Sequence, residues 1–200
     1  MLPTVHGEKW DLSMGKAGAL MATRLWLERV VIGLSLCPWA RPVHEDRGGV
    51  RFAHTASTKT EGLCVDLLRE IELLGQTEAT ETTILVCPEA FVDDFVEFNM
   101  FVADAEELLC ELDLDDQYQL VAFHPQFRFA GEPEDDAGNW VNRSPHPAVH
   151  ILTQASVTMA IDRQPTLAGQ TPEVNRRLLE KIGADEMRRR VEATRNDAAP

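Results

Sequence analysis

The chain has 200 residues, of which 44% are hydrophobic, and its formal net charge at pH 7 is −14. This length and apolar content fit one globular domain with a sizeable core. The acidic balance argues against a nucleic-acid surface and against docking on anionic lipid, because both require clustered Lys and Arg. A local basic pocket for an anion stays compatible with the average charge, and Arg143 with Arg128 is the candidate pair.

The cysteine spacing and the N-terminal sequence both indicate a cytoplasmic protein. None of the four cysteines stands in a Cys-x-x-Cys pair, so a zinc ribbon and a thioredoxin-type pair are excluded. No signal peptide is visible, and the first long apolar segment carries Arg24, Glu28 and Arg29, which a membrane-spanning helix would not hold without partners. We therefore expect reduced thiols and no membrane partner.

Helical and strand patterns alternate along the chain. Apolar residues at helical spacing predict helices over about 16–36, 58–75 and 90–112, and a last helix from about 171. Short apolar runs predict strands over 50–54, 82–86 and 118–123. This order predicts an α/β fold: a small parallel or mixed sheet of about three strands with helices packed on both faces. Residues 1–15 are interpreted as a loose leader, 16–184 as the domain, and 185–200 as a charged tail or frayed helix.

Three residues stand at the carboxyl ends of the three predicted strands. They are His54, Cys87 and His124. Ligands of open parallel sheets bind beyond the carboxyl ends of the strands. These residues therefore either form the floor of a site or stand at the strand ends by coincidence.

The stretch 124–150 is the candidate site. It gathers histidines, acids, arginines and asparagines among three aromatic residues and four prolines. A connection of this length without periodicity is usually functional or disordered. Its aromatic residues need burial, which argues against disorder.

A helix is predicted to begin at Pro147, at the end of this stretch. Proline suits the first helical position, with His146 at the N-cap, and an apolar stripe at helical spacing continues to Met159. His146 and His150 stand four residues apart and would share one face of that helix.

A metal site is the first interpretation of the stretch. His124, His146 and His150, with Asp135 or Asp136, supply the ligand counts that zinc and non-haem iron require. The alternative is that His124 caps a strand end, His146 caps the helix, and His150 faces solvent.

An anion site is the second interpretation. Asn139, Asn142, Arg143 and Ser144 stand beside the predicted helix N-terminus, where free N–H groups and the helix dipole attract phosphate or carboxylate. The alternative is that Arg143 pairs with Asp135 or Asp136 to hold the loop, and that the asparagines make turn bonds.

A nucleophilic cysteine is the third interpretation. Cys37 follows a helix C-terminus, whose dipole disfavours a thiolate, with only Arg41 and His44 nearby to lower its pKa. The alternative is a small buried hydrophobic residue beside Trp39.

Three segments carry a resemblance to a known family. They are LCPWA at 36–40, AFHP at 122–125 and NWVNRSPHPAVHIL at 139–152. With these motifs, the chain resembles the bacterial family called domain of unknown function 1415 over about residues 17–183. That family has no assigned activity, cofactor or catalytic residues, so the resemblance implies no specific chemistry.

The sequence thus favours an enzyme that acts on an anionic small molecule by hydrolysis or transfer, with or without a divalent metal (Zn or Fe). Arg143, with Arg128, Asn139, Asn142 and Ser144, would bind the anion, and His124 would act as general base or metal ligand. Asp135 or Asp136 would orient His124 or act as a metal ligand. The alternative is a non-catalytic ligand-binding or protein-binding module that uses the same loop, and the third candidate is a hydrolase or transferase with Cys37 as nucleophile.

Overall fold

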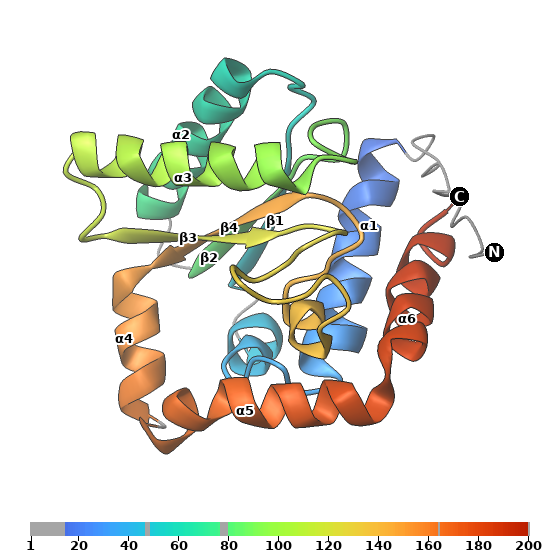
Figure 1. Cartoon of the computed structure of the whole chain (residues 1–200). Coiled ribbons are helices and arrows are strands. Elements are labelled where there is room, and N and C mark those ends of the chain that lie inside the picture. Colours follow the sequence, from blue (N-terminus) through green and yellow to red (C-terminus); the bar gives the residue numbers. More distant parts are fainter. Residues whose placement is uncertain (1–14, 47–48, 77–79, 164, 200) are drawn as a thin grey trace.

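The structure is a computed structural model, and it describes residues 15–46, 49–76, 80–163 and 165–199. Four strands in this part of the chain form one sheet in the order β1-β2-β4-β3 (Figure 1). β1 (Val50–His54) and β2 (Thr82–Val86) are parallel, and β3 (Tyr118–Phe123) points the same way. The predicted α/β class and the three forward strands are confirmed.

The fourth strand stands where a helix was predicted. β4 (Ala148–Thr153) runs antiparallel between β2 and β3, and α4 (Gln154–Arg163) begins only after it. The helix predicted from Pro147 is therefore wrong in its first half, and His146 caps no helix. Val149 and Ile151 face one side of the sheet while Ala148 faces the other, and all three are fully buried. A strand covered on both faces shows a continuous apolar run, which periodicity cannot distinguish from a buried helix.

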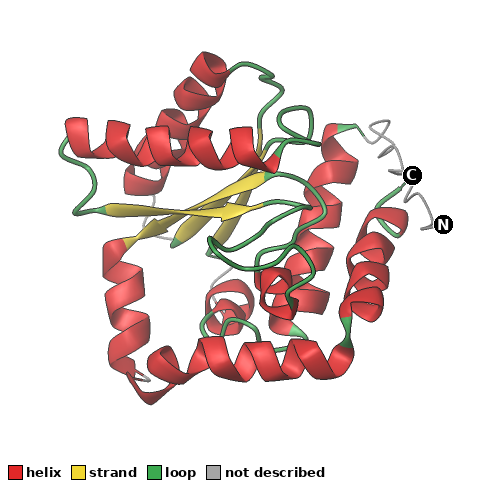
Figure 2. Ribbon diagram, in the orientation of Figure 1, coloured by secondary structure: helices red, strands yellow, loops and turns green. Residues whose placement is uncertain are grey.

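Two helices cover one face of the sheet. α2 (Thr60–Gln76) and α3 (Phe95–Glu111) lie on this face (Figure 2). Their apolar stripes pack on Leu85, Leu120 and Ile151. α3 begins later than predicted because Asp94 caps it, accepting a hydrogen bond from the Glu97 N–H at 2.8 Å. Burial of these stripes against the sheet is the main stabilising contribution of this layer.

The other face is covered by the two ends of the described chain. α1 (Lys16–Trp26) continues into a π-helical segment, η1 (Leu27–Ile32), and a second short one, η2 (Pro42–Asp46), follows. α5 (Pro165–Ile182) and α6 (Ala184–Asn196) pack on the same side (Figure 1). α5 contains Pro172 in its interior rather than at its start, so the predicted beginning near 171 was too late. Asn175 on α5 donates a buried hydrogen bond to the Leu36 carbonyl at 2.8 Å, which ties α5 to the segment that follows η1.

The charged C-terminal segment contributes to the core. Residues 185–200 were expected to be a tail or frayed helix, whereas α6 occupies 184–196 and buries Met187 and Val191. The expected leader, residues 1–15, lies almost wholly outside the described residues. None of the helices in the described ranges is long and apolar enough to cross a membrane.

Replacement of Met187 tests whether α6 belongs to the core. Met187 is 0% exposed, so Met187→Ala should lower the free energy of unfolding by about 2–5 kcal/mol through lost burial and a cavity. The control Met159→Ala, at a side chain that is 43% exposed on α4, should change it by less than about 0.5 kcal/mol. Urea denaturation measures both, and equal small effects would show that α6 is not packed.

Candidate functional site

The stretch 124–150 is held together by its own polar groups. Asn139 is 0% exposed within η3 (Ala137–Val141), and its Oδ1 accepts the Phe129 N–H at 3.0 Å. Its Nδ2 donates to the carbonyls of Pro133 and Glu134 at 2.9 and 3.2 Å. Asn142 donates to the Ala122 carbonyl at 3.2 Å. Both asparagines therefore make the loop-shaping bonds that were the alternative to ligand binding.

Arg143 fastens the same stretch through backbone carbonyls rather than through a carboxylate. Its Nε donates to Phe127 O at 3.1 Å and its Nη2 to Glu134 O at 2.6 Å. The guanidinium carbon lies 4.9 Å from the centre of the Trp140 ring, a cation–π distance. Arg128, predicted as its companion, is exposed. The helix N-terminus invoked for the anion site does not exist, because β4 begins there.

His124 is a fully buried residue with both ring nitrogens engaged. Nε2 donates to the Phe91 carbonyl at 2.8 Å, and Nδ1 accepts the Gln126 N–H at 3.0 Å. The bond to Phe91 supports a residue with φ of +57°, a strained conformation for a non-glycine residue. Burial lowers the pKa of His124, which favours the neutral ring. A metal or a proton would have to displace one of these two bonds.

The predicted acids and histidines do not converge. Asp135 is exposed, whereas Asp136 accepts from the Gly138 N–H at 2.7 Å and from Arg176 of α5 at 2.7 Å. Burial, with Arg195 nearby, lowers the pKa of His146 to about 3. Within the described ranges, no group of three His, Cys, Asp or Glu side chains is placed to hold a metal ion.

The strand ends are also spread apart by β4. His54 ends β1 and His124 follows β3, and these outer strands are three strand spacings apart, which corresponds to about 14 Å. Cys87 is buried between them, and its N–H donates to the Pro147 carbonyl at 2.8 Å. Burial raises the pKa of the Cys87 thiol to about 12, so the thiol stays protonated.

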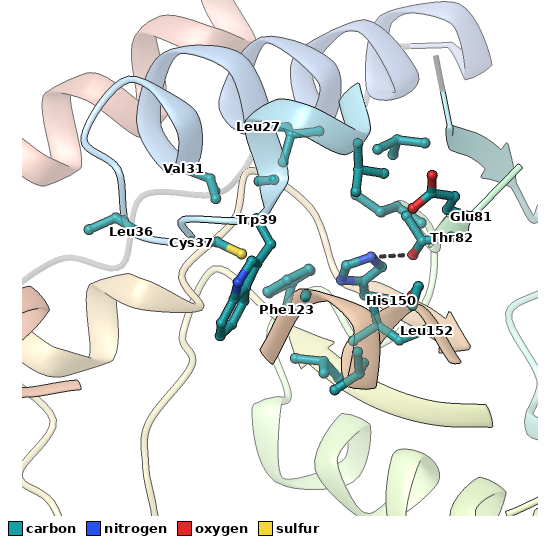
Figure 3. Close-up of a pocket in the computed structure, with 18 of the residues that line it drawn as sticks. Leu27, Val31, Leu36, Cys37, Trp39, Glu81, Thr82, Phe123, His150 and Leu152 are labelled. Carbon is teal, nitrogen blue, oxygen red and sulfur yellow. Dashed lines mark hydrogen bonds between the residues drawn. The ribbon is translucent and has the colours of Figure 1, made fainter. Parts of the chain in front are cut away.

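A cavity of about 310 Å³ lies on the face of the sheet that α1 and η1 cover (Figure 3). It is enclosed by the first helix, the 36–43 segment, the sheet and the beginning of α4. Its walls are predominantly apolar, with Trp26, Val31, Trp39, Phe123, Leu152 and Val157 among them. Its polar groups include Cys37, Glu81, Thr82, Asn142 and His150. The candidate functional site is this cavity, and Cys37, Asn142 and His150 are the predicted residues that line it.

Strand register explains why His150 points into the cavity. His150 pairs with Ile84, whose side chain belongs to the core on the α1 side, and paired residues share a face. Thr82 lies diagonally on the same face, and its Oγ1 is 2.5 Å from His150 Nε2 (Figure 3). The Phe123 ring stacks on the imidazole with centroids 5.6 Å apart.

The tautomer of His150 follows from the single hydroxyl proton of Thr82. Thr82 Oγ1 donates that proton to the Ile151 carbonyl at 2.7 Å, so it accepts from His150 Nε2–H. Nδ1 is then unprotonated, and in the described residues it has no hydrogen-bond partner. Burial lowers the pKa of His150 to about 4. The imidazole is therefore neutral at pH 7 and offers one acceptor.

Cys37 lines the same cavity with a protonated thiol. Burial raises its pKa, and hydrogen bonding to the Trp39 and Ala40 backbone opposes that rise only in part. The sulfur lies on the opposite side of Phe123 from Thr82 (Figure 3). Cys37 was interpreted either as a nucleophile or as a small buried residue beside Trp39. The structure shows a half-buried thiol beside Trp39 that also faces the cavity.

Comparison with known proteins places the chain in a family. A family model described as a protein of unknown function (DUF1415) matches residues 19–189. The chain belongs to this family. No curated protein and no solved structure matches the chain. The predicted family is thus confirmed, and the function has to be inferred from the residues.

The sequence interpretation missed most of the cavity. Thr82 and Glu81 stand at the start of a strand with no motif around them, and Trp39 was considered only as a neighbour of Cys37. His150 was selected as a metal ligand on a helix, whereas it is a strand residue that faces an apolar space. Because residues 147–159 were interpreted as a helix, the alternation of side chains along β4, which places His150 in the cavity, was not recognised.

The titration of His150 predicts how stability depends on pH. Its pKa is 6.5 in an unfolded chain and about 4 in the folded protein, so between these values the unfolded state binds the proton. The stabilising contribution is complete above pH 6.5 and is lost as pH falls toward 4, by about 3 kcal/mol at 1.36 kcal/mol per pH unit. Urea denaturation at pH 7 and pH 4 should show a smaller loss in His150→Phe than in the wild type.

Thr82→Val is the matched control for this measurement. It removes the hydroxyl but leaves the buried imidazole, so the pH dependence should persist. Equal pH dependence in His150→Phe and the wild type would contradict the assignment.

Proposed function

We propose that this protein binds a small, neutral and largely apolar molecule in the cavity beside α1, with a hydrogen-bond donor of that molecule on His150 Nδ1. One observation carries the proposal: a neutral imidazole with an unused acceptor faces an apolar cavity of about 310 Å³. Small-molecule sites are typically concave, mostly apolar and about 300–1,000 Å³ in volume, with a few polar groups that fix orientation.

The walls favour an apolar ligand body. Apolar cavities of this kind hold water poorly and accept apolar molecules instead. Burial of ligand surface contributes about 25 cal/mol per Å² of apolar area removed from water. The cavity therefore supplies affinity, and the single acceptor supplies selectivity.

The charge of the lining disfavours an anion in this cavity. Glu81 lines it, and no Lys or Arg is among the described residues that do so. The anionic substrate expected from the sequence is therefore not proposed for this site.

The two reactive groups favour binding over catalysis. His150, with a pKa of about 4, is a weak base at neutral pH, and a general base works best with a pKa near the working pH. Cys37 is held as the thiol, which is a poor nucleophile. We thus favour the non-catalytic alternative, although its site is the cavity and not the loop itself.

We also infer a cytoplasmic location. All four cysteines are free in the structure, including three that are exposed or half-buried. Free thiols are typical of reducing compartments.

A pair of matched probes tests the role of His150. 2-Naphthol has an apolar body and a donor hydroxyl, whereas 2-methoxynaphthalene lacks the donor. Isothermal titration calorimetry should show the wild type binding 2-naphthol about tenfold more tightly, about 1.4 kcal/mol for one hydrogen bond. In His150→Phe the two probes should bind equally. Binding of neither probe to the wild type would refute the proposal.

The location of the probe is tested by filling the cavity. Ala160 of α4 lines the cavity, and Ala160→Phe should prevent 2-naphthol from binding. Met159→Phe is the control, because Met159 is 43% exposed on the same helix and does not line the cavity. Binding that survives Ala160→Phe would place the probe elsewhere.

Protection of Cys37 gives an independent readout. Iodoacetamide should alkylate Cys37 more slowly when 2-naphthol is bound, because ligand and reagent compete for the same space. Cys110 on α3 is exposed, so its rate should not change. Mass spectrometry of tryptic peptides measures both rates in one sample, and equal protection of the two cysteines would argue against a specific site.

A further inference from the structure

A second, smaller cavity lies where α6 meets the segment that precedes β4. Its volume is about 90 Å³, close to the liquid volume of about three water molecules. Pro125, Trp140, Arg143 and Ser144 line one side, and Arg188, Val191, Glu192 and Arg195 line the other. The two sides are far apart in the sequence, and folding brings them together.

The lining concentrates positive charge in an acidic protein. Arg143, Arg188 and Arg195 face the same small space with Glu192 as the only acid among its described lining residues, which leaves a net charge of +2. The chain as a whole has 19 Lys and Arg against 33 Asp and Glu. Like charges around a partly desolvated space repel one another, and this arrangement is costly unless an anion compensates.

Burial and mutual repulsion are visible in the pKa values. Burial lowers the pKa of Arg143, and Arg188 lowers it further, while Glu134 opposes the change. Burial lowers the pKa of Arg195 to about 10, with Glu192 opposing. The guanidinium groups of Arg143 and Arg195 nevertheless remain charged at neutral pH.

The printed contacts of Arg143 and Arg188 differ in what they explain about the pocket. Arg143 is fixed by two backbone carbonyls and by the Trp140 ring, so its guanidinium is already in place before any ligand arrives. Arg188 pairs only locally, with Asp185 on the same helix at 3.1 Å, and its side chain is 55% exposed. That local pair does not explain why Arg188 faces a pocket with two other arginines.

We propose that the pocket formed by Arg143, Arg188 and Arg195 binds a phosphate group, either inorganic phosphate or the phosphoryl end of a molecule that extends into solvent. Guanidinium groups bind oxyanions with charge-assisted bonds, and three of them suit the several oxygens of phosphate. The volume leaves no room for more than the anion itself. The site is separate from the apolar cavity, and the proposal does not depend on the ligand proposed there.

The helix dipole does not contribute to this site. Arg188 and Arg195 lie in the middle and last turn of α6, and the C-terminal end of a helix repels anions. Affinity therefore has to come from the side chains, and single arginine replacements should affect it strongly.

Two neighbouring arginines on α6 provide a matched pair of variants. Arg188 lines the pocket, whereas Arg189 pairs with Glu186 on the surface and does not line it. Inorganic phosphate should bind the wild type saturably in calorimetry at constant ionic strength. Arg188→Gln should weaken this binding by about tenfold, and Arg189→Gln, with the same change in net charge, by less than about twofold. Glu192→Gln should tighten it, because the single acid of the pocket is removed.

Comparison of inorganic phosphate with glycerol 1-phosphate identifies the source of the group. Binding of both would support a phosphoryl end with the remainder in solvent, and binding of inorganic phosphate alone would support the free ion. No saturable binding of either below about 10 mM, an affinity weaker than about 3 kcal/mol, would overturn the proposal. Equal effects of Arg188→Gln and Arg189→Gln would also overturn it, because they would indicate nonspecific attraction.

Discussion

The antiparallel strand β4 is the constraint on which the rest of the structure depends. It lies between two strands of opposite direction, and it provides hydrogen bonds to both and core residues to both faces. Its alternation places Val149 and Ile151 against α2 and α3 and turns His150 toward α1. A shift of one residue in its register would move His150 into the opposite core. The position of the cavity acceptor is therefore set by strand pairing.

The segment that leads into β4 separates the two cavities. Val141 and Asn142 line the apolar cavity, while Trp140, Arg143 and Ser144 line the arginine pocket. Its backbone is fixed by Asn139 and Arg143 through backbone groups of the preceding loop, and by Asn142 through the Ala122 carbonyl of β3. The polar residues of this stretch thus mainly fix the backbone of residues 140–144, which line both cavities.

The sequence was sufficient to predict the three forward strands and insufficient to predict the antiparallel strand between β2 and β3. The forward strands were predicted with the bounds observed, because each is a short apolar run between turn residues. β4 was not, because Ala148, Ile151, Leu152, Ala155 and Met159 also fit a helical stripe, and α4 does follow directly. Only the pairing with β2 and β3, a tertiary interaction, decides between the two. α6 was underestimated for a related reason: its many charged residues conceal the buried positions Met187 and Val191.

The histidines show why residue type alone could not locate the site. His124, His146 and His150 are close in the sequence, and burial lowers the pKa of each one. Residue type and burial therefore do not distinguish them. Their partners distinguish them. His124 uses both nitrogens to hold backbone, whereas His150 uses one nitrogen on Thr82 and presents the other to a cavity. A buried imidazole is available to a ligand only when the fold leaves one nitrogen unused beside open space, and this condition is fulfilled by strand register and hydrogen bonding.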